Sequence, residues 1–289
     1  MLNLDDFKES IKTPISIKNL IKKGGQFLIN SNISNGRNEL EWYMQHLYNC
    51  DKINLFQISN NIVNNYIYNK ALHFIIDRSQ KIPFQYIMGE STFYGRNYLV
   101  NKHTLIPRPE TELIISLIQN RKCDSLVDIG TGTGCLGITA ALEKISDCID
   151  LIDINEQALH IAQKNSERFN IKNVRYFNLD ILIDIPPHQY DIVISNPPYI
   201  SKNEYNDLDA EVKNYEPYNA LSDSADGYTF YKRYASILNE ILKDQGIAIF
   251  EISHFFSKTK LLEIFKNFSN ISFHKDLNGD YRAIRIIND

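Results

Sequence analysis

Cysteine is scarce in this 289-residue sequence, and long apolar runs are absent. Its four cysteines lie too far apart for a Cys-x-x-Cys metal site or a dense disulfide framework, so we expect reduced thiols and no bound metal. No apolar stretch approaches the length that spans a bilayer, and the first ten residues lack the charged-then-apolar pattern of a secretory signal. These absences predict a cytoplasmic protein that does not associate with membranes.

An excess of positive charge is also missing. The formal net charge is −4 and the isoelectric point is near 6.0, so the overall field does not favour a polyanion, although a local basic patch could be hidden in that sum. We therefore expect no stable complex with nucleic acid. The chain is longer than a typical domain and 43% hydrophobic, which allows one large domain or a large domain with a small one.

The first part of the chain, residues 1–80, is predicted to be a small helical domain. Apolar side chains recur there at helical spacing, and asparagine-rich breaks separate the segments. The recurring sets are Leu40, Tyr43, Met44 and Leu47; Ile58, Ile62 and Tyr66; and Leu72, Ile75 and Ile76. Because the region clusters no catalytic residue types, we assign it to substrate docking. A lid that only completes the core is the alternative.

Residues 81–107 change character, because short aromatic runs are interrupted by Gly89 and Gly95, and they are predicted to be a β-hairpin linker. Residues 108–289 alternate strand-like and helix-like runs, which is typical of an α/β, doubly wound, mostly parallel sheet. Its seven predicted strands are 125–129, 148–152, 174–178, 191–195, 247–252, 271–274 and 281–287. The last two are joined only by the turn 276–280, which is too short for a helical crossover, so they should pair antiparallel.

A stiff polar turn, Asn196-Pro197-Pro198-Tyr199, follows the apolar strand 191–195. The two prolines cannot donate ladder hydrogen bonds, and they end the strand. The turn presents the Asn196 carboxamide, the Pro197 carbonyl and the Tyr199 ring where open α/β sheets bind their ligands. A planar NH2 group could donate to the two oxygens with its face against the ring. We therefore predict a site for an amino or amide nitrogen, with a simple strand-ending turn as the alternative.

Glycines follow the strand 125–129 in the run Gly130-Thr131-Gly132-Thr133-Gly134. Such spacing lets the backbone turn tightly and approach a ligand before a helix begins. It differs from the Gly-x-Gly-x-x-Gly pattern of dinucleotide sites and lacks the lysine of a P-loop. Asp128 precedes the loop and would repel a pyrophosphate, so we expect it to suit a cationic ligand.

Aspartates end the next two predicted strands. Asp153 can accept hydrogen bonds from both hydroxyls of a ribose, and Asp180 can accept from the exocyclic amine of a purine. Successive strands would then bind three parts of an adenosyl ligand. The alternatives are that Asp153 caps the following helix and that Asp180 is an ordinary turn residue.

Taken together, residues from 108 onward resemble the class I S-adenosylmethionine-dependent methyltransferases. More narrowly, the whole chain resembles the protein-(glutamine-N5) methyltransferase family that modifies peptide chain release factors. Besides the glycine loop and the Asn-Pro-Pro-Tyr turn, the resemblance is carried by Pro83-Phe84-Gln85-Tyr86-Ile87-Met88-Gly89-Glu90, Leu105-Ile106-Pro107-Arg108-Pro109-Glu110-Thr111-Glu112, Glu216-Pro217, Ala220-Leu221 and Gly227-Tyr228-Thr229-Phe230-Tyr231. Asn-Pro-Pro-Tyr alone is shared with amino-methyltransferases of DNA and RNA bases, whereas its combination with Arg-Pro-Glu-Thr-Glu and the helical domain is far more specific.

The resemblance implies a Rossmann-like fold and methyl transfer from S-adenosylmethionine to the glutamine N5 of a Gly-Gly-Gln motif in release factors. We expect a monomer. The cofactor residues that we predict are Gly130, Thr131, Gly132, Thr133, Gly134, Asp153, Asp180, Ile181 and Asn196, and the substrate residues are Asn196, Pro197, Pro198 and Tyr199. Ile181 stands where the family often has an aromatic residue, and Ser253 stands where it usually has glycine. Arg108 and Glu110 are interpreted as pocket-wall or interdomain residues, or as ordinary surface residues.

Asn196, Pro197 and Tyr199 are predicted to be catalytic because an amide nitrogen, whose lone pair is delocalised, is a poor nucleophile. Acceptor bonds from Asn196 and Pro197 would favour the charge that develops on that nitrogen, and in-line positioning would supply much of the rest. No histidine lies in the motif, and no general base is expected.

Two other functions stay open. The protein could methylate the amino group of adenine or guanine in RNA or DNA, with the base held against Tyr199. A basic channel would favour this function. Alternatively, it could be a cofactor-binding module that has lost catalysis and binds ribosomes or release factors. The intact Asn-Pro-Pro-Tyr turn argues against this third function.

Overall fold

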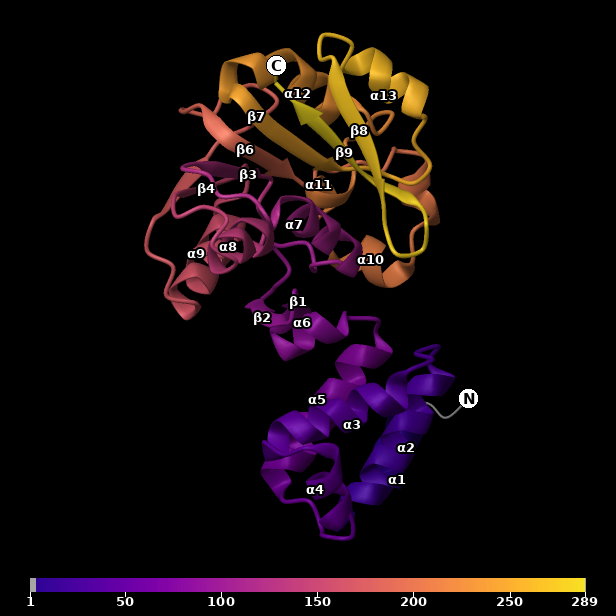
Figure 1. The fold of residues 1–289 in the computed structure, drawn as a ribbon. Helices are drawn as coiled ribbons and strands as arrows, with labels where there is room; N and C mark the ends of the chain where they lie inside the picture. The colour runs from indigo at the N-terminus through magenta and orange to yellow at the C-terminus, as the bar shows by residue number, and fades with distance from the viewer. Residues whose placement is uncertain (1–3, 289) are drawn as a thin grey trace. The chain divides into compact units, whose positions relative to one another are not determined.

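The computed structural model describes residues 4–288, which form two compact units (Figure 1). One unit ends at Met88 and the other begins at Gly89. The first three residues of the predicted domain 1–80 and the last residue of the predicted domain 108–289 lie outside the described residues. Within the described range, no helix combines the length and the apolar character that crossing a membrane requires.

The unit that ends at Met88 contains helices packed around one apolar core, as predicted. Leu20, Leu28, Leu40 and Phe74 are among its fully buried side chains. The helices are α1 (Leu4–Ser10), α2 (Ile17–Asn30), α3 (Gly36–Tyr48), α4 (Lys52–Gln57), α5 (Asn65–Ser79) and α6 (Phe84–Met88).

The helix expected to carry Ile58, Ile62 and Tyr66 does not form. Helix α4 ends at Gln57, and α5 begins anew after Asn64, whose side chain accepts a hydrogen bond from the Ile67 N–H. This N-cap defines a separate start for α5, so the helical spacing across the break is fortuitous.

The predicted hairpin linker is shorter than residues 81–107. Residues 84–88 form helix α6, and Phe84, Ile87 and Met88 pack against the core of the helical unit, which moves the boundary from residue 80 to Met88. The hairpin itself consists of β1 (Glu90–Phe93) and β2 (Arg96–Leu99), paired antiparallel. Its two-residue turn places Tyr94 and Gly95 at positive φ, as tight hairpins require.

The unit that begins at Gly89 also contains a seven-stranded sheet, which confirms the predicted fold class. Its strand order is β5-β4-β3-β6-β7-β9-β8, and only the pairs made by β9 are antiparallel, as predicted for the last two strands. The strands are β3 (Leu126–Ile129), β4 (Ile149–Asp153), β5 (Val174–Asn178), β6 (Tyr190–Ser195), β7 (Leu242–Glu251), β8 (Asn270–Lys275) and β9 (Tyr281–Ile287).

Helices cover both faces of this sheet (Figure 1). Alternate side chains of each strand point to opposite faces, so Val193 of β6 joins one apolar cluster and Ile192 joins the other. Helices α7 (Glu112–Ile118), α8 (Cys135–Leu142) and α9 (Glu156–Arg168) cover one face, and α12 (Thr229–Ile241) and α13 (Lys258–Ile264) cover the other. The remaining short helices are η1 (Pro109–Thr111), η2 (Glu204–Asp207), α10 (Ala210–Tyr215) and α11 (Tyr218–Leu221).

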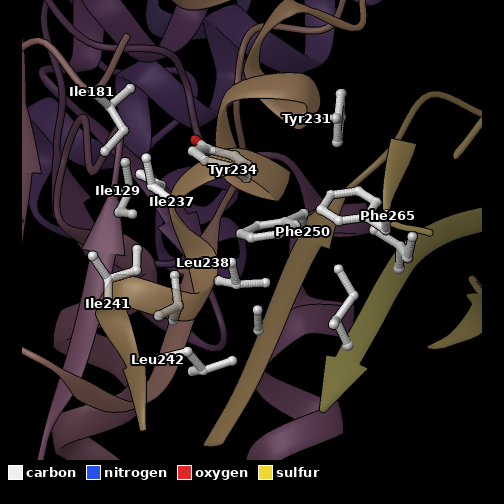
Figure 2. Close-up of a cluster of buried hydrophobic side chains, with 14 of the residues drawn as sticks. Ile129, Ile181, Tyr231, Tyr234, Ile237, Leu238, Ile241, Leu242, Phe250 and Phe265 are labelled. Atoms are coloured by element: carbon white, nitrogen blue, oxygen red, sulfur yellow. The ribbon is translucent and has the colours of Figure 1, made fainter. Parts of the chain in front are cut away.

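Figure 2 shows the core beneath α12, where aromatic and β-branched side chains interdigitate. The rings of Tyr234 and Phe250 stack with their centroids 4.5 Å apart. Ile129 and Ile181 extend this core to the carboxyl edge of the sheet, so a close-packed apolar cluster lies beneath the loops at that edge.

The strand order reverses direction between β3 and β6, which lie side by side. Ile129 at the end of β3 is paired with Ser195 at the end of β6, and their next residues are Gly130 and Asn196. Open α/β sheets bind ligands at such a switch point, outside the carboxyl ends of the strands. The fold therefore brings the glycine loop and the Asn-Pro-Pro-Tyr turn to one place.

Candidate active site

A pocket of about 250 Å³ opens at the carboxyl edge of the sheet. The loops after β3, β4, β5 and β6 form its walls, together with residues 103–105 and the segment before α12. From these loops it is lined by Gly130, Gly132, Asp153, Ile154, Asn155, Leu179, Asp180, Ile181, Leu182, Asn196 and Pro198, and from the other segments by His103, Thr104, Leu105, Asn219, Ala220, Ser222, Asp223, Ser224 and Phe230. The predicted switch-point site is therefore a real concavity.

Two glycines of the loop after β3 leave their backbone open to this pocket. Gly130 and Gly132 have φ angles of +72° and +55°, and a Cβ added at either one would have no atom within 4 Å. A ligand can thus approach the main chain closely there. Gly134 differs, because a Cβ would lie 2.7 Å from Ile138 Cδ1, so this glycine permits helix packing instead.

The two threonines of the loop are engaged in its internal structure. Thr131 Oγ1 donates to Asp128 Oδ2 at 2.7 Å, and Thr133 Oγ1 accepts from the Cys135 N–H. Neither threonine lines the pocket, and nor does Gly134. Of the five loop residues predicted to bind a cofactor, the structure places two on the pocket wall.

Asp128 holds the glycine loop from beneath and does not face a ligand. Only 1% of the residue is exposed, and Oδ2 also accepts from the Gly137 N–H at 3.0 Å. Burial raises the pKa of its carboxyl group to about 6, against the opposing effect of these hydrogen bonds. The expectation that Asp128 would suit a cationic ligand is wrong, because it is not a lining residue.

Asp153 and Asp180 both line the pocket. Asp153 accepts from the Gly132 N–H at 2.8 Å and the Asn155 N–H at 2.9 Å, so it ties the loops after β3 and β4 together. It is not the cap of α9, because Asn155 has that role. Asp180 accepts from the Leu182 N–H, so it is a turn residue as well as a wall residue.

The pocket wall is acidic. Among the described residues that line it, Asp153, Asp180 and Asp223 are aspartates and none is lysine or arginine. Such a wall attracts a positively charged ligand and repels a phosphate backbone. Leu105, Ile181 and other apolar residues supply hydrophobic surface beside these acids. The residues therefore fit a cationic ligand with an apolar part.

Asn196 is oriented by a hydrogen bond that sequence reasoning missed. Its Nδ2 donates to Thr111 Oγ1 at 3.1 Å, and Thr111 Oγ1 donates to Glu251 Oε2 at 2.5 Å. Thr111 and Glu251 are only 3% and 2% exposed. With the nitrogen bonded to Thr111, the Asn196 carboxamide oxygen is left as the acceptor.

Tyr199 shares the same buried carboxylate. Its hydroxyl donates to Glu251 Oε1 at 3.0 Å, and its ring meets Phe256 edge-on. Burial and the negative charge of Glu251 both raise the pKa of Tyr199, so the phenol stays protonated. Neither Tyr199 nor the buried Pro197 lines the pocket, whereas Asn196 and Pro198 do.

The Arg-Pro-Glu-Thr-Glu segment is held against the site by a second buried acid. Glu216 accepts from Arg108 Nη2 at 2.5 Å and from the Ile106 N–H at 3.1 Å. Arg108 and Glu110 are not among the lining residues, so their prediction as pocket-wall residues is not met. In the sequence, this contact is indicated only by the family resemblance of residues 105–112 and 216–217.

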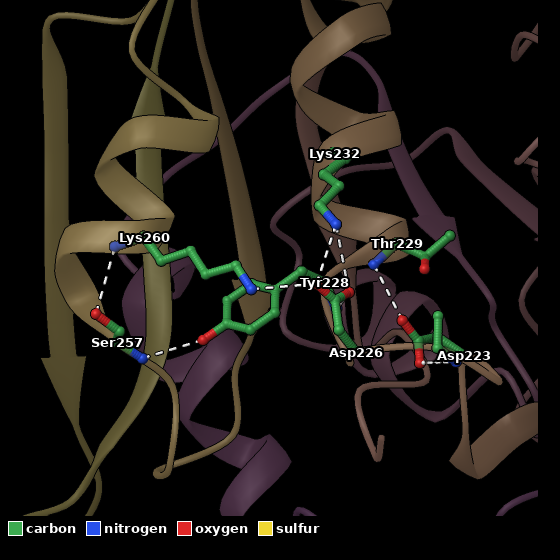
Figure 3. A network of polar contacts seen from close by, with 8 residues as sticks. Asp223, Asp226, Tyr228, Thr229, Lys232, Ser257 and Lys260 are labelled. Atoms are coloured by element: carbon green, nitrogen blue, oxygen red, sulfur yellow. Dashed lines mark hydrogen bonds and ion pairs between the residues drawn. The ribbon is translucent and has the colours of Figure 1, made fainter. Parts of the chain in front are cut away.

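A network of ion pairs fixes the segment that carries Asp223 into α12 (Figure 3). Asp223 accepts from the Thr229 N–H at 3.1 Å. Asp226 pairs with Lys232 of α12 and Lys260 of α13, each at 3.1 Å. The pocket residues of this segment are thus anchored to two helices.

Replacing Asp226 by asparagine should weaken folding in a pH-dependent way. Partial burial tends to raise the pKa of Asp226, but bonds from Lys260, Lys232 and Tyr228 N–H outweigh it and lower the pKa to about 2. Stability from such a group is present above pH 4 and is lost as the pH falls towards 2. Since the side chain is 45% exposed, we expect Asp226→Asn to cost at most about 1 kcal/mol at pH 7.

Urea unfolding at pH 7 and near pH 3 measures this effect. The difference between wild type and Asp226→Asn should shrink at the lower pH, whereas Asp147→Asn, at an exposed acid, should change little at either. A difference that grows on acidification would contradict the assigned ion pairs.

Comparison with known proteins gives the following matches. Residues 109–212 match the model of the methyltransferase small domain, and residues 19–89 match that of the PrmC N-terminal domain. A release factor glutamine methyltransferase from Fusobacterium nucleatum is 40% identical over 75% of this chain, which spans 63% of that relative's length. Enzymes of the same name from Bacillus subtilis and Flavobacterium psychrophilum are 38% and 35% identical, over 70% and 73% of this chain and 74% and 78% of their own.

Among solved structures, a methyltransferase from Pyrococcus furiosus superposes with a TM-score of 0.52 at 18% identity. The match covers 73% of this chain and 98% of the other. At that identity the likeness concerns the fold, and it agrees with the doubly wound sheet described above.

Proposed function

The chain belongs to the family of release factor glutamine methyltransferases, and we propose that it transfers a methyl group to the side-chain amide nitrogen of a glutamine in a peptide chain release factor. The glutamine is that of the Gly-Gly-Gln motif, and the methyl donor is S-adenosylmethionine. The observation that carries the proposal is the Asn196 carboxamide, held on the pocket wall with its nitrogen bonded to Thr111 and its oxygen left to accept.

The pocket residues fit the methyl donor. Gly130 and Gly132 leave the main chain open to it, and Asp153 has carboxylate oxygens at the place where ribose hydroxyls are bound in related folds. Asp180 and Ile181 offer an acceptor and an apolar surface for the purine. When bound, S-adenosylmethionine supplies an electrophilic methyl group on a positively charged sulfur, which the acidic wall favours.

The chain's own residues make the amide reactive. In a glutamine amide the nitrogen lone pair is delocalised, and positive charge develops on nitrogen as the N–CH3 bond forms. The broken S–CH3 bond would leave its electron pair on sulfur, and the charged amide loses one N–H proton to water. The Asn196 oxygen and the Pro197 carbonyl accept the two N–H bonds, so they stabilise that charge and fix the plane of the amide. No described residue donates to the Pro197 carbonyl. Tyr199, held by Glu251, supports the turn beside them.

Product identification by mass spectrometry tests the proposal. The chain is incubated with labelled S-adenosylmethionine and either a release factor or total RNA. We expect label on the glutamine of Gly-Gly-Gln and none in RNA. Label in RNA alone would favour the amino-methyltransferase of bases, and cofactor binding without transfer would favour a catalytically inactive binding module.

Base methylation in nucleic acid is the weaker candidate. The pocket wall carries aspartates, whereas a nucleic-acid channel needs lysine and arginine along the backbone path. The helical unit stays assigned to substrate docking because it clusters no catalytic residue types, with a lid that completes the core as the alternative. A cytoplasmic, monomeric protein is the remaining expectation, and the four unpaired cysteines fit a reducing compartment.

A further inference from the structure

We infer that Thr111 and Glu251 set the polarity of the Asn196 carboxamide, so that its oxygen and not its nitrogen meets the substrate amide. This inference rests on the proposed function for the identity of the substrate. Three residues from different parts of the chain form the device: Thr111 ends η1, Asn196 follows β6, and Glu251 ends β7.

The direction of the hydrogen bonds follows from counting protons. Burial raises the pKa of Glu251, whereas the hydrogen bonds from the Thr111 and Tyr199 hydroxyls oppose that effect and favour the carboxylate. A carboxylate can only accept, so the proton of the Thr111 hydroxyl, 2.5 Å from Glu251 Oε2, is donated to Glu251. A hydroxyl has one proton, so Thr111 Oγ1 can only accept from its other neighbour. That neighbour is Asn196, which must therefore present its NH2 group to Thr111 at 3.1 Å. The Asn196 oxygen then points away from Thr111.

The reversed carboxamide would oppose the reaction. It would place an NH2 group of Asn196 against the NH2 group of the substrate, and two donors cannot bond each other. The two orientations have nearly the same shape, so packing alone selects weakly between them. The buried hydrogen bonds from Asn196 through Thr111 to the Glu251 carboxylate select strongly between the two orientations. In the reversed orientation the Asn196 oxygen would meet Thr111, whose one proton is already donated to Glu251, and a buried polar group without a partner is costly.

Glu251 extends the same control to Tyr199. Its second oxygen accepts from the Tyr199 hydroxyl at 3.0 Å, so a single carboxylate holds both ends of the Asn-Pro-Pro-Tyr turn. The end of β7 lies beside that of β6, where Phe250 pairs with Ser195. Thr111 and Glu251 are thus positioning residues, which act on the substrate through Asn196 and Tyr199.

The test compares Thr111→Val, which is nearly isosteric but lacks the hydroxyl, with Thr111→Ser, which keeps it. Thr139→Val is the matched control, because Thr139 is also buried and hydrogen-bonded, to Tyr98, and does not line the pocket. We expect Thr111→Val to lower kcat on a release factor roughly 10- to 10²-fold, since misorientation of a catalytic group has effects of this size. Thr111→Ser should recover most of the rate, and the Kd of S-adenosylmethionine should stay within about twofold of wild type.

A second readout does not depend on turnover. The side-chain NH2 signals of Asn196, identified in asparagine-labelled protein by their loss in Asn196→Ala, should shift in Thr111→Val and stay in place in Thr139→Val. Unchanged signals together with an unchanged kcat in Thr111→Val would overturn the inference. So would equal losses in Thr111→Ser and Thr111→Val, or in Thr139→Val, because these indicate a general packing effect.

If Thr111→Val does not fold, Glu251→Gln replaces it. This variant keeps the shape of the side chain but places one NH2 group and one oxygen before the two hydroxyls, so one hydroxyl must become the acceptor. If that hydroxyl is Thr111, the Asn196 NH2 signals should shift and kcat should fall with them. A wild-type chain that fails to methylate a release factor would refute the proposed function instead, and the NMR comparison would still decide the orientation of Asn196.

Discussion

Asn196→Ala should reduce methyl transfer to a release factor on the order of 10³-fold, while S-adenosylmethionine binds nearly as before. Asn196 is expected to supply one of only two acceptors for the substrate N–H bonds, and removal of one preorganised polar group at a reacting centre costs about 10²- to 10³-fold in kcat. The cofactor keeps its other wall residues, including Gly130, Gly132 and Asp153. Steady-state kinetics with a release factor and calorimetric titration of the cofactor measure the two effects separately.

Asn173→Ala is the matched control for this prediction. Asn173 is exposed and precedes β5, at the opposite edge of the sheet from the pocket. Its replacement should leave both kcat and cofactor affinity unchanged. Equal turnover of Asn196→Ala and wild type would show that Asn196 has no role in the mechanism. If the variant lost cofactor affinity as much as turnover, the main role of Asn196 would be to bind the cofactor.

Asp153→Ala should weaken cofactor binding roughly 10²- to 10⁴-fold, since two hydrogen bonds from ribose hydroxyls to a charged acceptor contribute about 1.5–3 kcal/mol each. The carboxylate also accepts from the Gly132 N–H, so its loss should loosen the glycine loop. Burial raises the pKa of Asp153, against opposing bonds from the Asn155 and Gly132 N–H groups, so affinity should also fall towards acidic pH as the carboxylate is protonated. Calorimetry of the wild type and of the variant across pH measures both effects, because the pH dependence that comes from Asp153 should be present in the wild type and absent in the variant.

Asp147→Ala serves as the control for Asp153→Ala, because Asp147 is an exposed acid before the amino end of the same strand, β4. It should bind the cofactor like wild type. An Asp153→Ala protein with unaltered affinity, whatever its turnover, would contradict the assignment of the ribose to this carboxylate.

Local pattern was sufficient to predict much of this molecule. Strands such as 191–195 are short, apolar and bounded by turn residues, and a glycine loop or a strand-ending aspartate is visible within a few positions. The seven strands and the antiparallel final pair follow from such signals. The same signals single out Gly130, Asp153, Asp180 and Asn196, which the structure places on one pocket wall.

The features that the sequence did not predict correctly depend on contacts between residues that are distant in the chain. Asn196 and Thr111 are 85 positions apart and Thr111 and Glu251 are 140 apart, so no periodicity reports their hydrogen bonds. The sequence pattern predicts that Asp128 is a ligand residue, because its burial is not visible in the sequence. The run 84–88 has too few residues for its apolar pattern to distinguish strand from helix, and packing against the helical unit decides it.

The most direct test of the account is a crystal structure of the chain with S-adenosylhomocysteine and a peptide that contains Gly-Gly-Gln. We expect the glutamine amide nitrogen at about 3 Å from both the Asn196 carboxamide oxygen and the Pro197 carbonyl, with the sulfur of the cofactor product facing that nitrogen. A glutamine bound elsewhere, or one that meets the Asn196 nitrogen while Thr111 bonds the oxygen, would contradict it.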